Sequence, residues 1–193
     1  MRSNVREIFI NLEIKFDKSW SLFLDRDGVI NEKIENNYIK NWSEFSFTYK
    51  ARESLAILST FFNKIFIVTN QRGVGKGLMT EKDLILIHKK MLKSIKAKSG
   101  RIDNIYYCID ILDSSEFRKP NIGMALKAKT DFPSIDFRKS VMVGDSETDM
   151  IFGKTLGMKC FRINSNQILK EMHHFDEKFE SFFECSKFIV SRI

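Results

Sequence analysis

Short apolar runs that end abruptly in polar residues recur along this chain, and no other feature constrains its fold as strongly. Their length and their bounding residues predict buried strands at 20–24, 64–68, 102–109, 141–143 and 158–163. Asp25, Thr69, Asp110 and Asp145 stand at or just beyond the ends of the first four runs. Each of these strands is therefore expected to deliver a polar side chain to the loop at its carboxyl end.

The stretches between the expected strands carry apolar residues at helical spacing. They predict helices at 51–61, 81–99, 122–130 and 147–156. Thr80 is placed to cap the second of these helices. Strands that alternate with helices form a parallel sheet, because parallel neighbours need crossover connections. We therefore predict an α/β fold, a doubly wound parallel sheet with helices on both faces, which binds ligands at the carboxyl ends of its strands.

The chain has 193 residues and 43% apolar content, which is enough for one sizeable core. With 2 prolines and no linker, repeat or low-complexity stretch, residues 1–193 are expected to form a single domain. Segments 1–19 and 165–193 lie outside the alternation, and neither is given a catalytic role. Four phenylalanines of the second segment predict a terminal helix docked on the sheet: Phe179, Phe182, Phe183 and Phe188.

Neither export nor membrane insertion is indicated. No run approaches the roughly 18 apolar residues that a membrane span needs. The 3 cysteines are odd in number and widely spaced, which fits neither a disulfide framework nor a CxxC metal site: Cys108, Cys160 and Cys185. We therefore expect a cytoplasmic protein with no membrane partner. We also expect a monomer.

The net charge of +7 and the pI near 9.3 have two interpretations. A polyanionic partner such as nucleic acid is one. Against it, the densest basic run, residues 82–101, interleaves its charges with apolar residues at helical spacing, as a solvated helix face does. We expect no nucleic-acid partner.

Two carboxylates, Asp25 and Asp27, stand two residues apart at the end of the first strand, and Gly28 follows them. A calcium loop also begins with this spacing, but Val29 and Asn36 occupy positions where that loop needs ligands. An ordinary Asp-Gly turn remains an alternative for this segment taken alone.

The glycine-rich segment 68–77 resembles a phosphate loop but fails the nucleotide-binding templates. Asn70 and Gly77 break the Walker pattern, and Leu78 breaks the dinucleotide pattern. What remains is the hydroxyl of Thr69 at a strand end, followed by backbone N–H groups able to cradle an anion.

Two further segments open helices. Lys119 lies between Arg118 and a proline, and Asp145 lies four residues before Asp149, so that both carboxylates share one helix face. Asp149 has a plain alternative role, because aspartate in a first helical turn often only caps the helix.

Together and in this order, D-x-D-G, Thr, Lys and GDxxxD resemble the four motifs of the haloacid dehalogenase superfamily over about residues 20–163. Three motif sequences are similar to those of its histidinol-phosphatase and heptose-bisphosphate-phosphatase branch: DRDGVIN, TNQ with a glycine-rich loop, and RKP. The TNQ segment favours the heptose-bisphosphate phosphatases of that branch. The resemblance implies a Rossmann-like sheet. The expected loops leave no room for a large cap domain.

This resemblance implies a Mg²⁺-dependent phosphatase that works through an aspartyl-phosphate. Asp25 would be the nucleophile, and Asp27 the general acid and base. Mg²⁺ would be held by Asp25, Asp145 and the backbone carbonyl of Asp27. Lys119 would offset negative charge, and Thr69 would hold phosphoryl oxygens.

The remaining site residues follow from the same resemblance. Asp149 would orient metal-bound water or Lys119 from behind. The residues expected to contact substrate are Asn70, Gln71, Arg72 and Arg118. For Arg72 and Lys76 two alternatives remain: contact with substrate, or a solvated position on the surface. The histidines are expected at the surface: His88, His173 and His174.

Two departures from the branch bear on cofactor and substrate. Relatives often carry a zinc loop with C-x-H and C-x-C pairs, whereas Cys108 stands alone here in a short loop, so we expect no zinc. Ser146 stands where heptose phosphatases usually have lysine. The expected substrate is still a small sugar phosphate, D-glycero-D-manno-heptose 1,7-bisphosphate. Histidinol phosphate, a polynucleotide 3'-phosphate and a non-catalytic phosphate-binding scaffold are the alternatives, in that order.

Overall fold

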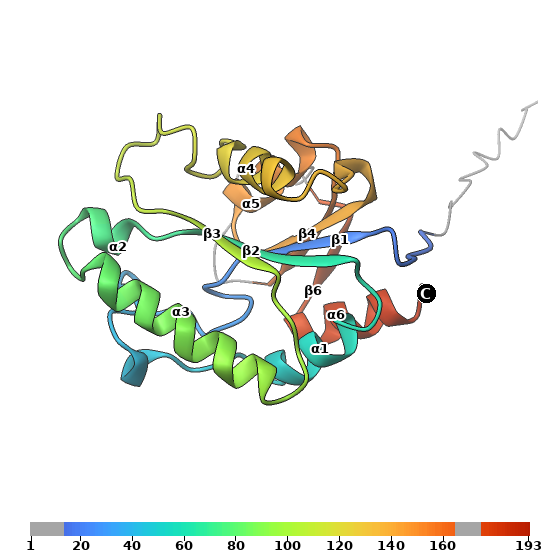
Figure 1. Ribbon diagram of the computed structural model, residues 1–193, viewed down its shortest axis with the longest axis horizontal. Coiled ribbons are helices and arrows are strands. Elements are labelled where there is room, and N and C mark those ends of the chain that lie inside the picture. The colour runs from blue at the N-terminus through green and yellow to red at the C-terminus, as the bar shows by residue number, and fades with distance from the viewer. Residues whose placement is uncertain (1–13, 165–174) are drawn as a thin grey trace, which may run out of the picture.

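The computed structural model of the protein describes residues 14–164 and 175–193. Within these ranges six strands form one sheet, in which every neighbouring pair runs parallel. The strands are β1 (Ser21–Leu24), β2 (Lys64–Asn70), β3 (Asn104–Cys108), β4 (Ser140–Gly144), β5 (Lys159–Ile163) and β6 (Glu177–Phe179). Their order across the sheet is β3-β2-β1-β4-β5-β6, so β1 lies in the interior between β2 and β4 (Figure 1).

Helices cover both faces of the sheet. In the described ranges they are α1 (Ala51–Leu58), α2 (Arg72–Gly75), α3 (Glu81–Lys96), α4 (Gly123–Asp131), α5 (Glu147–Thr155) and α6 (Phe182–Val190), with 3-10 turns η1 (Trp42–Glu44) and η2 (Phe137–Lys139). Helices α4 and α5 lie on one face, and α1, α3 and α6 lie on the other (Figure 1).

Alternation of side chains along the strands fills both layers of the core. Leu22 and Leu24 of β1 pack into the cluster that contains Leu55 of α1, whereas Phe23 packs into the cluster that contains Met150 of α5. Successive strand residues point to opposite faces, so an unbroken apolar run supplies both clusters. The predicted α/β fold class is confirmed.

The predicted strands and helices are also confirmed, with ends shifted by a few residues. Thr80 caps α3 as predicted: its side chain accepts a hydrogen bond from the Asp83 N–H, and the Asp83 carboxylate accepts one from the Thr80 N–H. The chain between β1 and β2, all of it described, holds only η1 and α1 as helices, which leaves no large cap domain there.

Three local predictions differ from the structure. Phe179 lies in β6, a sixth strand that was not expected, and the terminal helix begins at Phe182. The glycine-rich loop contains the short helix α2. His88 was expected at the surface and is instead buried, because it follows Leu84 by one helical turn on the inward face of α3.

No helix of the described ranges is long and apolar enough to cross a membrane. His173 and His174 lie outside the described residues, as does the segment 1–13. The single domain, the monomeric state and the cytoplasmic location stay predictions.

Candidate active site

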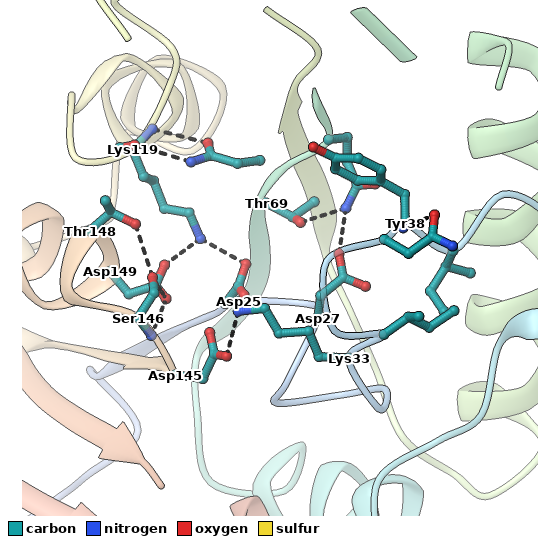
Figure 2. Close-up of a pocket in the computed structure, with 15 residues that line it drawn as sticks. Asp25, Asp27, Lys33, Tyr38, Thr69, Lys119, Asp145, Ser146, Thr148 and Asp149 are labelled. Carbon is teal, nitrogen blue, oxygen red and sulfur yellow. Dashed lines mark hydrogen bonds and ion pairs between the residues drawn. The ribbon is translucent and has the colours of Figure 1, made fainter. Parts of the chain in front are cut away.

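Polar side chains meet where β1, β2 and β4 end. Asp25 follows β1 directly, and its backbone N–H donates to the Val143 carbonyl of β4 at 2.9 Å. The two strands therefore fix the backbone at which the first carboxylate projects. Figure 2 shows Asp25 among Lys119, Asp145 and Asp149, and Asp27 on the opposite side of the cavity.

Two glycines allow these segments to approach one another. Gly28 has a φ of 92°, and a Cβ atom there would lie 2.6 Å from Asp145 Oδ2. At Gly144 a Cβ atom would lie 2.3 Å from the Cβ of Asp149. A side chain at either position would push the carboxylates apart, so the glycines belong to the construction of the site.

Lys119 joins two of the carboxylates. Its Nζ lies 2.8 Å from Asp25 Oδ1 and 2.5 Å from Asp149 Oδ1, and it also donates to the Val68 carbonyl at 2.6 Å. All three charged side chains are almost completely buried. The other Asp149 oxygen accepts from the N–H and hydroxyl of Ser146. Asp149 therefore both caps α5 and holds Lys119.

The pKa values of Asp25 and Lys119 are both raised in this cluster. Burial raises the pKa of Asp25 to about 7; Lys119 opposes that rise, and the carboxylates of Asp149 and Asp145 add to it. Although burial alone lowers the pKa of Lys119, Asp149 and Asp25 raise it above its ordinary value. Lys119 is accordingly a permanent cation beside a carboxylate that is costly to ionise.

Asp27 has the opposite environment. Its carboxylate accepts two hydrogen bonds from Arg26 Nη2, at 2.8 and 3.0 Å, and one each from Asn31 and Gln71 at 2.9 Å. Burial raises the pKa of Asp27, but the Arg26 guanidinium and these donors outweigh burial and lower it. Arg26 in turn lies 3.2 Å from the Nε2 atom of His88.

Residues at the end of β2 contact different parts of the site. The Gln71 amide bridges Asp27 and the Thr69 hydroxyl, at 2.9 and 2.8 Å. Asn70 exchanges two hydrogen bonds with the backbone of Lys119, at 3.0 and 3.1 Å. All three line the cavity. Asn70 therefore positions the Lys119 segment, and its contact with substrate stays a prediction.

Arg72 and Arg118 converge on one exposed carboxylate instead of on the cavity. Arg72 Nη2 lies 2.5 Å from Asp113 Oδ1, and Arg118 Nε lies 3.0 Å from the same atom. Neither arginine is among the residues that line the cavity. The structure thus ties the loop after β3 to α2 through Asp113, and the substrate contacts of both arginines stay predictions.

Asp145 completes an acidic cluster. One carboxylate oxygen from each of Asp25, Asp145 and Asp149 lies within 4.8 Å of the others, and in the described part of the chain this is the cluster suited to a metal ion. Three buried carboxylates form an all-oxygen set, which fits a hard cation such as Mg²⁺. Asp145 also contacts Lys33, whose Nζ lies 2.7 Å from its Oδ2.

The cavity bounded by these residues has a volume of about 200 Å³. It brings together all five residues that the sequence placed in catalytic or metal-binding roles: Asp25, Asp27, Thr69, Lys119 and Asp145. Its other wall comes from the loop after β1, from which the Tyr38 ring faces the site (Figure 2). The lining residues of that loop are Lys33, Ile34, Asn37, Tyr38 and Ile39.

Lys33 and Arg26 contribute to the site but were not identified from the sequence. Lys33 reaches Asp145 from a loop that carries no recognisable motif, so no sequence signal marks it. Arg26 is fully buried beside Asp27, and the sequence did contain a sign of its role. An arginine within a run of buried strand-end residues needs an anionic partner, and the adjacent aspartates supply it.

Sequence comparisons relate this chain to known phosphatases. Residues 21–185 match the family model described as polynucleotide kinase 3 phosphatase. The D-glycero-alpha-D-manno-heptose-1,7-bisphosphate 7-phosphatase of Campylobacter jejuni is 38% identical over 136 residues, which cover 70% of this chain and 77% of the relative. The enzyme of the same name from Mycobacterium bovis is 36% identical over 132 residues, covering 68% and 70%.

Solved structures show the same fold. The D,D-heptose 1,7-bisphosphate phosphatase of B. bronchiseptica, complexed with magnesium and phosphate, matches with a TM-score of 0.82 and 22% identity over 90% of this chain and 99% of that one. The predicted family resemblance is confirmed. With a family model covering most of its length and relatives at 36% and 38% identity over two thirds of it, the chain belongs to the polynucleotide kinase 3 phosphatase family of the haloacid dehalogenase superfamily.

Proposed function

We propose that this phosphatase removes the 7-phosphate of D-glycero-D-manno-heptose 1,7-bisphosphate. The observation that carries the proposal is the buried pairing of Asp25 with Lys119 beside Asp145, in a cavity of about 200 Å³. Relatives named for this reaction, with the alpha form of the sugar in some and the beta form in others, support the substrate.

Asp25, Asp145 and the backbone carbonyl of Asp27 would hold Mg²⁺, and Asp149 would act from behind them. The B. bronchiseptica enzyme was solved with magnesium and phosphate, which supports this choice. When bound, the ion supplies positive charge that offsets the negative charge of the phosphate group and the carboxylates.

In the first half-reaction, Asp25 attacks phosphorus through Oδ2, since Oδ1 accepts the hydrogen bond of Lys119. A bond forms between that oxygen and phosphorus, and the bond from phosphorus to the sugar oxygen breaks. Asp27 donates a proton to the departing oxygen. The products are the dephosphorylated sugar and an aspartyl-phosphate.

In the second half-reaction, Asp27 is a carboxylate and takes a proton from water. The water oxygen attacks phosphorus, the bond to Asp25 breaks, and inorganic phosphate leaves. Lys119 offsets the charge on Asp25 and on the phosphoryl oxygens throughout, and the Thr69 hydroxyl holds one of those oxygens. Gln71 fixes the positions of Thr69 and Asp27 relative to each other, because its amide donates to both side chains.

The test is kcat/KM for three substrates at two salt concentrations. We expect the heptose bisphosphate to exceed histidinol phosphate and a 3'-phosphorylated oligonucleotide. EDTA should stop turnover, and added Mg²⁺ should restore it. The oligonucleotide is the alternative that the family model's description and the net charge of +7 favour. If it wins and its advantage collapses as salt rises, the basic surface binds phosphates and the sugar assignment is wrong.

The proposal includes no zinc. Cys108 Sγ lies 3.7 Å from both an Asp110 oxygen and the Ser115 hydroxyl, which gives the short loop after β3 a polar network of its own. Elemental analysis of the purified protein should find less than one zinc per chain. A stoichiometric zinc content would overturn this part of the proposal.

A further inference from the structure

A second lysine faces the metal-binding carboxylates from the opposite side to Lys119. Lys33 lies in the loop after β1, and its Nζ is 2.7 Å from Asp145 Oδ2. Figure 2 shows its side chain extending from the loop to that carboxylate. Lys33 and Lys119 are the two lysines on the described wall of the cavity, which has no arginine.

The two lysines divide the acidic cluster between them. Lys119 pairs with Asp25 and Asp149, while Lys33 pairs with Asp145. Three carboxylates within 4.8 Å repel one another strongly in a buried site, so each positive charge stabilises the cluster when no metal is bound. Lys33 supplies this charge directly at Asp145, with 2.7 Å between Nζ and Oδ2.

Their attachment differs. The Lys119 side chain is 2% exposed and is held by Asp25, Asp149 and the Val68 carbonyl. The Lys33 side chain is 42% exposed, so a turn about its flexible stem takes the ammonium into solvent or into the cavity. A fixed cation and a releasable cation thus serve neighbouring carboxylates.

We propose that Lys33 is an internal counter-ion that a divalent cation displaces from Asp145, and that the displaced ammonium then binds a second anionic group of the substrate. Both a metal ion and the ammonium need the Asp145 carboxylate, and two cations cannot share it closely without repulsion. The counter-ion role stands independently of the reaction, whereas the substrate role rests on the proposed function.

The placement of the other cations supports the substrate role. Arg72 and Arg118 are paired with Asp113 away from the cavity, and Lys76 lies over the Tyr38 ring, 5.3 Å from its centroid. Lys33 is therefore the cation placed to meet an anionic group that lies inside the cavity but is not the one being transferred. A bisphosphate carries such a group, and the corresponding monophosphate does not.

Calorimetric titration with MgCl₂ tests the counter-ion role without any turnover. Lys33→Gln should bind Mg²⁺ about fivefold more tightly than wild type, because the ion no longer has to displace an ammonium. Mg²⁺ should also raise Tm more in this variant. Lys76→Gln, which removes the same charge without contacting Asp145, should match wild type. Unchanged or weaker Mg²⁺ binding by Lys33→Gln would overturn the proposal.

The substrate role is tested at saturating Mg²⁺ with a sugar bisphosphate and its monophosphate analogue. Lys33→Gln should reduce the preference for the bisphosphate about fivefold, mainly through KM, and Lys33→Arg should restore most of it. An unchanged preference would refute the substrate role. A wild-type protein with no phosphatase activity would refute the proposed function instead, and calorimetry would still decide the counter-ion role.

Discussion

Asp25 and Asp27 stand two residues apart, yet their surroundings shift their pKa values in opposite directions. On the Asp25 side, three carboxylates are buried together, and the pKa of Asp25 is raised to about 7 by burial in spite of Lys119. On the Asp27 side, Arg26, Asn31 and Gln71 all donate to one carboxylate, and its pKa is lowered. Environment, and not residue type, separates the two proposed roles.

This difference has a mechanistic consequence. Without substrate, Asp27 is held as a carboxylate, which is the form that would activate water in the proposed second half-reaction. Donating a proton in the first half-reaction requires that Asp27 lose part of its contact with Arg26. We therefore expect substrate binding to loosen that pair.

The largest effect should come from Asp25→Asn. The amide keeps the shape of the side chain but cannot attack phosphorus, so turnover of any phosphomonoester should fall below detection. Folding should persist, because the replacement removes a charge that burial disfavours. Kinetic assays with Tm as the folding control check this. Activity within tenfold of wild type would show that Asp25 is not the nucleophile.

Asp27→Asn should have a smaller effect, and one that depends on the leaving group. With a sugar phosphate the rate should fall by about 10²- to 10⁴-fold, the usual contribution of general acid–base catalysis. With an aryl phosphate, whose leaving group needs no proton, formation of the intermediate should be nearly normal in a burst experiment. Equal losses with both substrates would contradict the acid role.

Lys119→Met tests how much the Asp25 side of the site depends on its cation for stability. It leaves Asp25 and Asp149 buried without their shared cation, which should reduce the free energy of unfolding by about 3–5 kcal/mol at neutral pH. Urea unfolding measures the loss. The double variant with Asp149→Asn should recover part of it, because one of the two carboxylates is then neutral. A variant as stable as wild type would mean that the pair contributes nothing.

The smallest expected effect is that of replacing His88, which contacts Arg26, on the pH dependence of stability. Burial and the Arg26 charge lower the pKa of His88 to about 3, so the unfolded chain binds a proton there more readily than the folded one. This group therefore costs stability as pH falls below about 6.5, by up to about 1.4 kcal/mol per pH unit. His88→Gln, which can still accept from Arg26, should flatten the slope of unfolding free energy between pH 7 and 5.5. Identical slopes would place His88 in a solvated position.

Much of the molecule could be predicted because local patterns agree with the global fold. Apolar runs of strand length that end in polar residues define β1, β2 and β4, and the resemblance to known motifs identified the residues at their ends. Strand β6 escaped prediction, since the 3-residue strand at the sheet edge has exposed or half-buried side chains and no apolar run.

The side-chain partners around the cavity could not be predicted from the sequence. Sequence spacing cannot show which partner a long, flexible side chain selects. Asp113, an exposed loop residue, pairs with the two arginines expected near substrate. Lys33, from a loop without any motif, reaches across to Asp145. Such choices depend on how distant loops fold over one another, which periodicity does not encode.

The position of β1 in the sheet has a consequence for the newly made protein. Asp25 follows β1 directly, but β4, the strand that lies beside β1, begins only at Ser140, and β5 and β6 follow later still. As the polypeptide emerges from the ribosome, β1 can pair with β2 before β4 is made, so one edge of β1 stays unpaired while residues 71–139 are synthesised. Asp25 is thus synthesised long before the strand that encloses it, and nascent chains stalled before residue 140 expose an unpaired strand edge to which chaperones can bind.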